Sequence, residues 1–449
     1  MKKLLALVLS LMLALTMASF ASAESTVPTF DSFVLGTDYT DLTASIKVLT
    51  HRTDLLESGA FDAYVAEFNK VYPNITVTYE GITDYAQDSI IRLSGSTDWG
   101  DIMMMPASIE ADEFENYFVP FGNLDEMTAL YNFIDSKQYQ GVVYGIPSTG
   151  NAQGIVYNKA VFAAAGIEEI PKTPDEFIAA LKLIKENTDA IPLYTNYAAG
   201  WTMGAWDAYL GGSATGDSDF MNIDMLHMRD PFADRGDGTG PYAVYKILYD
   251  AVANGLIEDD YTTTDWESSK VMINNGEIGC MVLGSWAYSQ MRDAGDHGED
   301  IGYMSFPITV NGKQYASAGA DYCYAINKFS SEENQTASMI YIKWLTYESG
   351  FSYNEGGIPI NKDGAYPDLY AAFEGIEFVA DVSALADEAT LPDELNSESS
   401  LSLNRGNNEK VQKIVEAAFN GTQTFDEIMA DWNEAWTEAQ DDLGVTINE

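Results

Sequence analysis

Residues 61–79 read FDAYVAEFNKVYPNITVTY and predict a helix followed directly by a strand. The apolar positions of the first part recur at the spacing of one helical face: Phe61, Tyr64, Val65, Phe68, Val71 and Tyr72. Pro73-Asn74 ends this pattern, and residues 75–79 then alternate as a strand does. A helix that leads straight into a strand is the repeating unit of an α/β sheet.

The same alternation continues on both sides of this stretch. Ile46 to Leu49 predicts a strand that ends at the polar turn His51-Arg52-Thr53-Asp54. Downstream, Tyr85 to Leu93 predicts a helix and Ile102 to Met105 a further strand. The order strand, helix, strand, helix, strand is typical of a parallel α/β sheet.

Three further regions carry structural signals. Thr173-Pro174-Asp175-Glu176 predicts a helix start, with Thr173 as the N-cap and Glu176 closing a capping box. Near the C-terminus we expect a helix over Glu409 to Phe419 and another capped by Thr424 with Glu427, whose buried side includes Trp432 and Trp436. Residues 217–240 are rich in glycine, aspartate and methionine and predict an excursion loop.

The N-terminus predicts an exported protein. Lys2 and Lys3 precede an apolar run from Leu4 to about Met17, and Ala21-Ser22-Ala23 suits a signal peptidase, so residues 1–23 are interpreted as a signal peptide. No cysteine follows the apolar run to carry a lipid, which leaves periplasm, free secretion and another tether as alternatives. The formal net charge of −46 disfavours nucleic acid and anionic lipid as partners.

The two cysteines are predicted to be free thiols. Cys280 and Cys323 both lie inside apolar, strand-like runs, where cysteine commonly serves as a small hydrophobic side chain. We therefore expect no disulfide between them.

A series of short segments resembles a known family in both content and order. They are Phe68 to Ile75, Leu93-Ser94-Gly95 before Asp101-Ile102, Tyr144-Gly145-Ile146-Pro147, Tyr157-Asn158-Lys159 with Phe162 and Gly166-Ile167, Pro171 to Phe177, Asn275-Gly276-Glu277 with Met281 and Gly284-Ser285-Trp286-Ala287, and Gly356-Gly357-Ile358-Pro359. Together they resemble the family 1 extracellular solute-binding proteins, the sugar-binding group of ABC transporters that includes maltose-binding protein.

The resemblance implies an α/β, two-lobed periplasmic-binding-protein-like fold (type II), with a ligand cleft between lobes joined by three crossing segments. We expect the crossings near Pro147 to Asn151, Ser305 to Pro307 and Ile358 to Asn361. The expected division is an N-lobe of residues 24–149 and 307–359 and a C-lobe of residues 150–306 and 360–449. Clefts between lobes are common ligand sites, which agrees with this expectation.

Two turns, each directly after a predicted strand, contain the first candidate ligand-binding residues. Trp286 follows an apolar strand in a Gly-Ser-Trp turn, which in the family presents an aromatic platform to the sugar. The turn His51-Arg52-Thr53-Asp54 follows the first strand, where its polar groups suit sugar hydroxyls, which both donate and accept hydrogen bonds. A surface ion pair between Arg52 and Asp54 is the alternative interpretation.

Further candidate ligand-binding residues lie elsewhere in the sequence. Asn151 lies six residues before Tyr157, where the maltose-binding relative carries a polar side chain that contacts ligand. Asp321 and Tyr322 follow the small-residue run Ala316 to Ala320. Trp201 is a candidate second platform; the other indoles proposed for this role are Trp206 and Trp266, and packing is the alternative for all three.

The sequence favours binding without chemistry. Its three histidines are scattered, and it has neither metal-ligand spacing nor a P-loop, Rossmann or nucleophile-elbow motif. We therefore expect no catalytic residue, metal or cofactor, and a monomer that passes an oligosaccharide to ABC permease subunits. Two alternatives stay open: a secreted glycoside hydrolase using a carboxylate pair, and a peptide- or polyamine-binding protein of the same fold.

Overall fold

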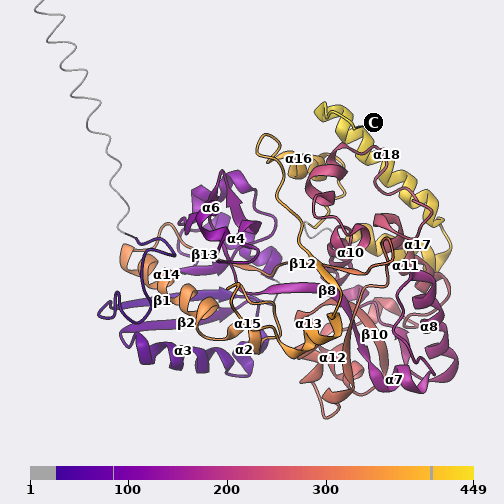
Figure 1. The fold of residues 1–449 in the computed structure, drawn as a ribbon, viewed down its shortest axis with the longest axis horizontal. Coiled ribbons are helices and arrows are strands. Elements are labelled where there is room, and N and C mark those ends of the chain that lie inside the picture. Colours follow the sequence, from indigo (N-terminus) through magenta and orange to yellow (C-terminus); the bar gives the residue numbers. More distant parts are fainter. Residues whose placement is uncertain (1–26, 84, 405–407, 449) are drawn as a thin grey trace, which may run out of the picture.

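The computed structural model describes residues 27–83, 85–404 and 408–448, and the chain forms two lobes (Figure 1). The predicted signal peptide, residues 1–23, lies outside the described residues. Each lobe is built on its own sheet. We call the lobe around the five-stranded sheet the first lobe and the lobe around the six-stranded sheet the second lobe.

The sheet of the first lobe has the strand order β2-β1-β3-β13-β7. Its strands are β1 (Ala44–Thr50), β2 (Ile75–Gly81), β3 (Ile102–Met104), β7 (Ile146–Pro147) and β13 (Cys323–Ile326). β1 pairs in parallel with both β2 and β3, as the sequence predicts, and β13 is antiparallel to β3. A small separate sheet consists of β4 (Gly122–Asn123), β5 (Gln138–Tyr139) and β6 (Val142–Val143).

Helices cover this sheet and bury its apolar residues. They are α2 (Thr53–Glu57), α3 (Ala60–Val71), α4 (Tyr85–Gly95), α5 (Phe114–Tyr117), α6 (Leu124–Thr128), α14 (Glu332–Tyr347) and α15 (Phe351–Asn354). Phe61 and Phe68 of α3 are buried in one core with Ile46 and Val48 of β1. The predicted helix and strand of residues 61–79 are therefore confirmed as α3 and β2.

The sheet of the second lobe has the order β14-β12-β8-β10-β9, with β11 also paired to β8. Its strands are β8 (Gly150–Asn158), β9 (Ile191–Leu193), β10 (Ile278–Gly284), β11 (Ile301–Ser305), β12 (Tyr315–Ala320) and β14 (Glu377–Val379). Side chains alternate between two cores: Ile155 and Cys280 face one of them and Val156 and Met281 the other. Both faces of this sheet are buried, which explains its nearly continuous apolar strands.

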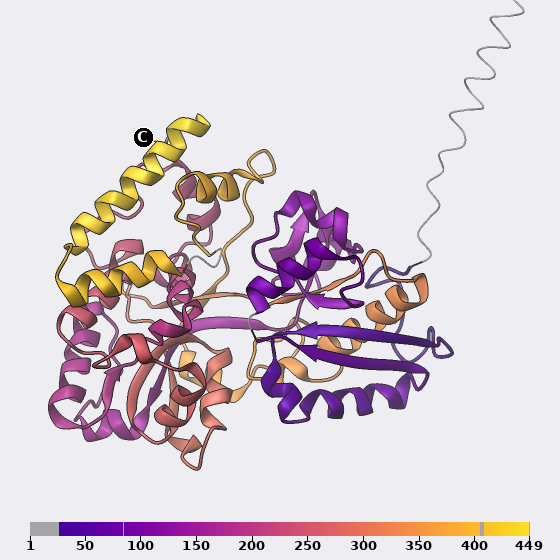
Figure 2. The same ribbon diagram turned by 180° about the vertical axis from the view of Figure 1, so that it is seen from behind.

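The helices of the second lobe gather around this sheet, and the C-terminal helix lies at the outer side of the lobe (Figures 1 and 2). They are α7 (Lys159–Ala164), α8 (Pro174–Asn187), α9 (Trp201–Gly204), α10 (Gly212–Thr215), α11 (Gly240–Ala253), α12 (Trp266–Asn274), α13 (Trp286–Arg292), α16 (Leu391–Glu398), α17 (Glu409–Asn420) and α18 (Phe425–Leu443). Trp432 and Trp436 of α18 are core residues, as expected.

The helix starts were predicted with one error. Thr424 and Glu427 form the predicted capping box of α18. At α8, Thr173 accepts a hydrogen bond from the Glu176 N–H at 3.3 Å, as expected of an N-cap. The Glu176 carboxylate, however, accepts from the Lys172 N–H at 2.8 Å instead of from Thr173, so the predicted capping box is not closed.

Residues 217–240 do not form a simple loop. They contain a π-helical turn, Phe220–Asp224, followed by a short 3₁₀ helix, Met225–His227. Phe220, Met225 and Phe232 are buried in the core of the second lobe. The glycine and aspartate content suggested an excursion, but these apolar side chains anchor the segment.

The first and third crossing segments lie side by side, and residues 360–362, expected in the C-lobe, contact the first lobe through the buried side chain of Ile360 and the Lys362 N–H, which donates to the Leu130 carbonyl at 3.1 Å. Gly150 and Ile358 exchange backbone hydrogen bonds of 2.8 and 2.7 Å. From Gly150 the long strand β8 runs into the second lobe (Figure 1).

The second crossing lies later in the chain than residues 305–307. Phe306 and Ile308 belong to a core of the second lobe, and β12 pairs with β8 through Ala318↔Ala152. The chain enters the first sheet only at β13. Residues 307–320, expected in the N-lobe, thus belong to the second lobe, because a turn at Asn311 and Gly312, both with positive φ, returns β12 along β8.

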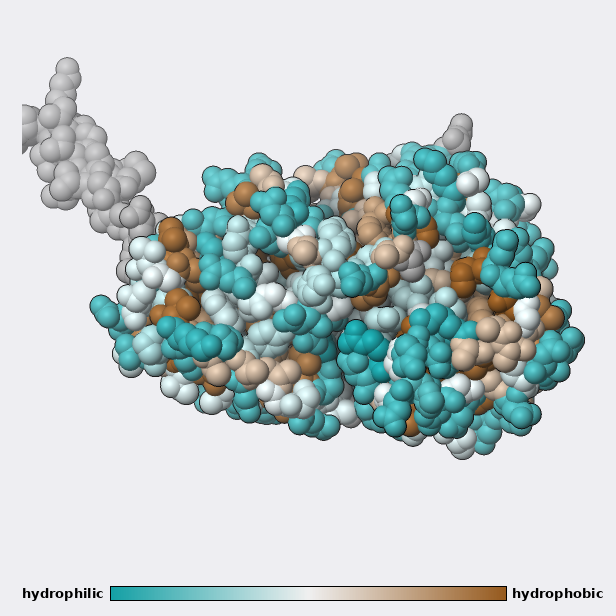
Figure 3. Space-filling model, turned by 60° about the horizontal axis from the view of Figure 1, so that its bottom comes forward, coloured by the Kyte–Doolittle hydropathy of each residue, from teal (hydrophilic) through white to brown (hydrophobic). Residues whose placement is uncertain are grey.

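Three further features concern the cysteines, the surface and the helices. Cys280 on β10 and Cys323 on β13 are buried free thiols in different sheets. Hydrophilic residues spread over both lobes in Figure 3, with hydrophobic residues in separate patches between them. In the part of the chain that the structure describes, no helix is both long and apolar enough to cross a membrane.

Candidate functional site

The turn after β1 lies at the edge of the first sheet where its parallel strands end. β1 ends at Thr50, and the Arg52 N–H donates to the Thr50 hydroxyl at 3.1 Å, which fixes the turn before α2 begins. The methyl group of Thr53 lies close to Gly81, at the end of β2. Ligands of open parallel sheets bind beyond this edge.

Arg52 is held by two carboxylates. Its Nε and Nη2 atoms donate to the two oxygens of Asp54 at 2.9 and 2.7 Å, and Nη2 also donates to Glu355 at 3.1 Å. Burial favours the neutral form of Arg52, but the two carboxylates outweigh it and raise its pKa. The side chain is only 14% exposed. This is a bidentate pair in a largely dry setting, rather than a loose surface contact.

The two carboxylates bound to Arg52 differ in pKa. Burial raises the pKa of Glu355, and Arg52 offsets this only in part. Burial acts in the same direction on Asp54, but the hydrogen bonds and charge of Arg52 outweigh it, so the pKa of Asp54 is lowered. Asp54 is therefore the firmer anionic partner of the guanidinium group.

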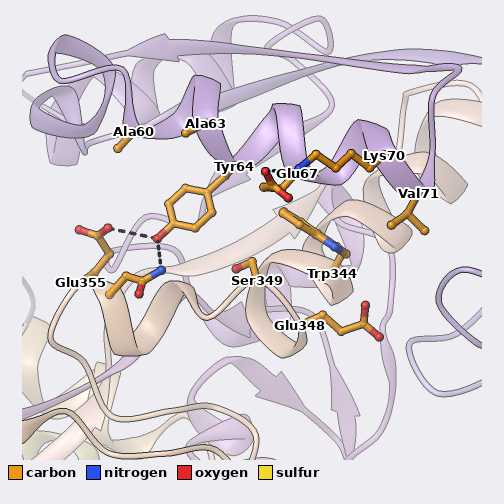
Figure 4. A pocket seen from close by; sticks show the side chains of 11 residues that line it. Ala60, Ala63, Tyr64, Glu67, Lys70, Val71, Trp344, Glu348, Ser349 and Glu355 are labelled. Atoms are coloured by element: carbon orange, nitrogen blue, oxygen red, sulfur yellow. Dashed lines mark hydrogen bonds and ion pairs between the residues drawn. The ribbon is translucent and has the colours of Figure 1, made fainter.

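Glu355 also joins Arg52 to a pocket of about 620 Å³ on the first lobe (Figure 4). The Tyr64 hydroxyl of α3 donates to Glu355 at 3.4 Å and accepts from the Asn354 amide at 3.0 Å. Burial raises the pKa of Tyr64 to about 12. Trp344 and Glu348 line the far side of this pocket, which lies within the first lobe.

His51 lies between two tyrosine rings. Its ring centroid is 4.5 Å from that of Tyr322, and its edge contact with Tyr85 is at 5.9 Å. The Nδ1 atom is buried without a hydrogen-bond partner among the described residues. Burial lowers the pKa of His51 to about 4, although the Asp321 charge acts to raise it, so the imidazole is neutral near pH 7. Asp321 itself accepts from the Tyr322 N–H at 2.7 Å.

Asn151 and Ser285 meet where the crossing segments enter the second lobe. The Ser285 hydroxyl donates to the Asn151 side chain at 3.3 Å and accepts from the Tyr370 hydroxyl at 2.9 Å. The Ala152 N–H also donates to Ser285. Asn151 and Ser285 are both buried, so this network fixes the backbone just before Trp286.

Three tryptophans of the second lobe form one aromatic cluster. Trp201 lies 5.0 Å from Trp266 and 5.5 Å from Trp286, and Trp266 lies 5.8 Å from Trp286, all measured between ring centroids. The rings meet at angles of 54–80°, so they pack edge to face or tilted rather than stacked. Trp201 is 40% exposed. We call these three residues the tryptophan cluster.

Gly284 makes room for the Trp286 ring. A β-carbon at Gly284 would lie 2.5 Å from the indole Nε1 of Trp286. The glycine of the Gly-Ser-Trp turn therefore lets the indole fold back over the end of β10. This placement gives Trp286 a fixed orientation at the start of α13.

The sequence model of the bacterial extracellular solute-binding proteins matches residues 53–350. This chain belongs to that family. Two solved structures from Bifidobacterium animalis subsp. lactis are also similar. A binding protein of an ABC transporter in complex with mannobiose is 50% identical, with a TM-score of 0.91 over 93% of this chain and 99% of that chain. A manno-oligosaccharide-specific solute-binding protein in complex with mannotriose is 49% identical, with a TM-score of 0.90 over 92% and 99%.

A more distant relative covers much of the chain. The multiple sugar-binding protein of Streptococcus mutans is 22% identical over 316 residues, which are 68% of this chain and 72% of the relative.

The structure brings the predicted site residues of this solute-binding protein into separate groups. His51, Arg52, Asp54 and Tyr322 lie together on the first lobe, with Asp321 beside them. The tryptophan cluster belongs to the second lobe, and Asn151 lies at the crossing.

Two predicted site residues do not join these groups. Thr53 packs towards Gly81. Trp206 is only 3% exposed and packs against Phe306 in the core, so its alternative interpretation as a packing residue is correct.

Sequence reasoning missed several residues of this solute-binding protein. Glu355 directly precedes the Gly356-Gly357-Ile358-Pro359 segment, and that position was a usable signal for a residue at the crossing. Tyr64 looked like part of the buried stripe of α3. Lys270 follows Trp266 by one helical turn and covers its ring at 4.9 Å, which spacing alone could have suggested.

Proposed function

We propose that this protein is the manno-oligosaccharide-binding component of an ABC importer and that it binds its ligand between the two lobes without chemistry. The observation that carries the proposal is the 49–50% identity, over more than nine-tenths of the chain, to binding proteins solved with mannobiose and mannotriose. The residue groups described above supply the two kinds of contact that a sugar needs.

The tryptophan cluster supplies the apolar contact. One face of a pyranose carries mainly C–H groups, and packing it on an indole buries apolar area without requiring hydrogen bonds. Trp286 is held by Gly284 and Ser285, and Trp201 is the most exposed ring of the three. We assign the platform role to Trp286 and Trp201, with Trp266 behind them.

The first lobe supplies the polar contacts. Hydroxyl groups both donate and accept, and charged partners give the stronger hydrogen bonds. Arg52 with Asp54 and Glu355 offers donors and acceptors in a fixed arrangement. His51 is neutral near pH 7, so it offers one donor and one acceptor nitrogen.

The ligand is proposed to draw the lobes together. Residues 27–149 and 321–362 would move against residues 150–320 and 366–448, with the crossings as the hinge. The closed protein would then dock on the permease subunits of the importer as a monomer. Export, predicted from residues 1–23, would place it on the side of the membrane where the sugar is found.

The hydrolase alternative is disfavoured by the placement of the carboxylates. Asp54 and Glu355 have pKa values shifted in opposite directions, as an acid and base pair would. Both, however, accept from the same Nη2 atom of Arg52, so they lie on one side of the site. Glycosidases place their two carboxyl groups on either side of the scissile bond.

Calorimetric titration of the mature protein tests the proposal. Mannobiose and mannotriose should bind, whereas a peptide and a polyamine should not. A ligand at a hundred times its Kd should stabilise the fold by roughly 2.7 kcal/mol in a thermal scan. Mannotriose recovered intact after long incubation separates binding from hydrolysis. Lack of binding to both mannosides would refute the proposed ligand, and release of mannose would refute the absence of chemistry.

A further inference from the structure

Lys270 is unusually buried for a lysine on a helix surface. Its side chain is 12% exposed, whereas its ion-pair partner Glu267, at 2.8 Å, is 76% exposed. Glu267 itself lies largely in solvent. The Lys270 ammonium group instead lies 4.9 Å from the centre of the Trp266 ring, one helical turn back on α12. This is a cation–π contact, which is stronger where water is excluded.

Trp266 is the member of the tryptophan cluster that Lys270 touches. Its ring meets Trp201 at 80° and Trp286 at 58°. The helix start is fixed separately, because the Asp265 side chain accepts from the Ser268 N–H at 2.8 Å. With the backbone fixed, the lysine over its face constrains the remaining freedom of the Trp266 ring. The position of Trp266 in turn limits where Trp201 and Trp286 can lie.

The same part of the second lobe meets the first lobe. α12 packs against α13, and the Ser289 hydroxyl of α13 donates to the Glu355 backbone carbonyl at 3.5 Å. α2 and α15 lie on the side of the first lobe nearer to α12 and α13 (Figure 1). Burial raises the pKa of Asp54 of α2, whereas Arg52, the Leu55 N–H and the charge of Lys270, in that order, lower it.

Glu355, Arg52 and Asp54 form one group of ion pairs on the first lobe, and Lys270 pairs with Glu267 on the second. We propose that Lys270 is a positioning residue that orders the tryptophan cluster and attracts the Arg52–Asp54 pair across the lobe boundary. Closing the lobes and fixing the aromatic platform would then be one event. The proposal rests on the proposed function, because it assumes that the cluster contacts the sugar.

Substitutions at Lys270 can separate the effect of its charge from the effect of its shape. K270M keeps an unbranched apolar chain over Trp266 and removes the charge, whereas K270R keeps the charge. K246M is the matched control: Lys246 also pairs with an acid on its own helix, Asp250, and lies 5.9 Å from the Phe425 ring, but on α11, outside the site. Each protein is titrated with mannotriose at about 0.02 M and about 0.5 M NaCl, because salt screens exposed charges beyond a Debye length.

K270M should bind mannotriose about five- to tenfold more weakly at low salt, the loss expected for a desolvated cation–π contact with a facing charge. The difference from wild type should shrink at high salt, and K270R should restore most of the affinity. K246M should match wild type throughout. The loss of binding free energy in the D54N/K270M double variant should be smaller than the sum of the two single losses, since each substitution removes one side of the same attraction.

Wild-type affinity and salt dependence in K270M would overturn the inference, as would additive effects of D54N and K270M. A failure of wild type to bind mannotriose would instead count against the proposed ligand. In that case near-ultraviolet circular dichroism of the ligand-free proteins decides: the tryptophan bands should change in K270M and be kept in K270R. Identical spectra in K270M and wild type would refute the ordering role.

Discussion

The backbone of Gly357 passes directly against the side chain of Thr149: a β-carbon on Gly357 would lie 1.8 Å from the Thr149 Oγ1 atom. Thr149 Oγ1 also donates to the Ile358 carbonyl at 3.1 Å. The first and third crossing segments are therefore in contact through atoms that leave no space for any side chain at residue 357. This close approach adds to the backbone hydrogen bonds between Gly150 and Ile358 that hold the two segments together at the lobe boundary.

G357A is expected to destabilise the protein by about 1–3 kcal/mol, because the added methyl group has to displace Thr149 or the crossing strand. Chemical denaturation measures this change. G95A is the control, since a β-carbon at Gly95 would meet no atom within 4 Å. A G357A protein as stable as wild type would mean that the two crossings separate easily.

W286A is expected to weaken mannotriose binding by about 1–3 kcal/mol or more, through loss of the apolar platform and of its contacts with Trp201 and Trp266. W286F should retain part of the affinity. Y347A, at an exposed aromatic residue of α14 on the first lobe, should bind as wild type does. Calorimetric titration compares them, and full affinity in W286A would remove Trp286 from the site.

R52K is expected to lower mannotriose affinity at least about tenfold, because a lysine cannot form the bidentate pair with Asp54 while also bonding Glu355. R292K is a matched control. Arg292 makes the same kind of bidentate pair with Asp293, with both bonds at 2.7 Å, but 43% of its side chain is exposed. Equal losses in both variants would show that the effect comes from folding rather than from the site.

The free energy of unfolding should fall as the pH drops from about 6.5 to about 4, in part through His51. Its pKa is lowered from 6.5 to about 4 in the folded protein, so the unfolded chain binds the proton first over this window. Urea titrations near pH 7 and near pH 4.5 should show a smaller pH-dependent loss in H51Q than in wild type. H297Q, at an exposed histidine, controls for the substitution of a histidine by glutamine as such. A loss as large in H51Q as in wild type contradicts the assignment.

Mannotriose is expected to reduce the radius of gyration in small-angle scattering, because lobes joined by extended segments have a small shared interface and can close. Mannose should bind more weakly than mannotriose, since several indoles suit several rings. An unchanged radius at saturating mannotriose would argue against hinge closure. A tighter affinity for mannose would end the oligosaccharide assignment.

Much of the fold could be predicted because its signals are local. The helical stripe of α3, the alternation in β2 and the capping box of Thr424 and Glu427 each depend on neighbouring residues. The second crossing was placed too early because residues 306–320 are apolar enough for either lobe. The Asn311-Gly312 pair is a strong hairpin signal, and it was the feature that could have assigned these residues to the second lobe.

The site was less predictable because its contacts join distant parts of the chain. Arg52 with Asp54 is a local pair, and the turn that carries it was found. The partner Glu355 is 303 residues away from Arg52, and no spacing rule connects them. Trp201, Trp266 and Trp286 were each named, but only the packing of α9, α12 and α13 reveals that they touch one another.

The tryptophan cluster also gives this protein a built-in optical reporter. Of its eight tryptophans, the other five are at most 9% exposed: Trp99, Trp206, Trp344, Trp432 and Trp436. Because they are buried in the cores of the two lobes, they are expected to contribute a background emission that changes little when ligand binds. A ligand that covers Trp201 would shift the fluorescence of the three rings of the tryptophan cluster. Binding can therefore be followed on the unlabelled protein, in a stopped-flow instrument, without attaching a dye.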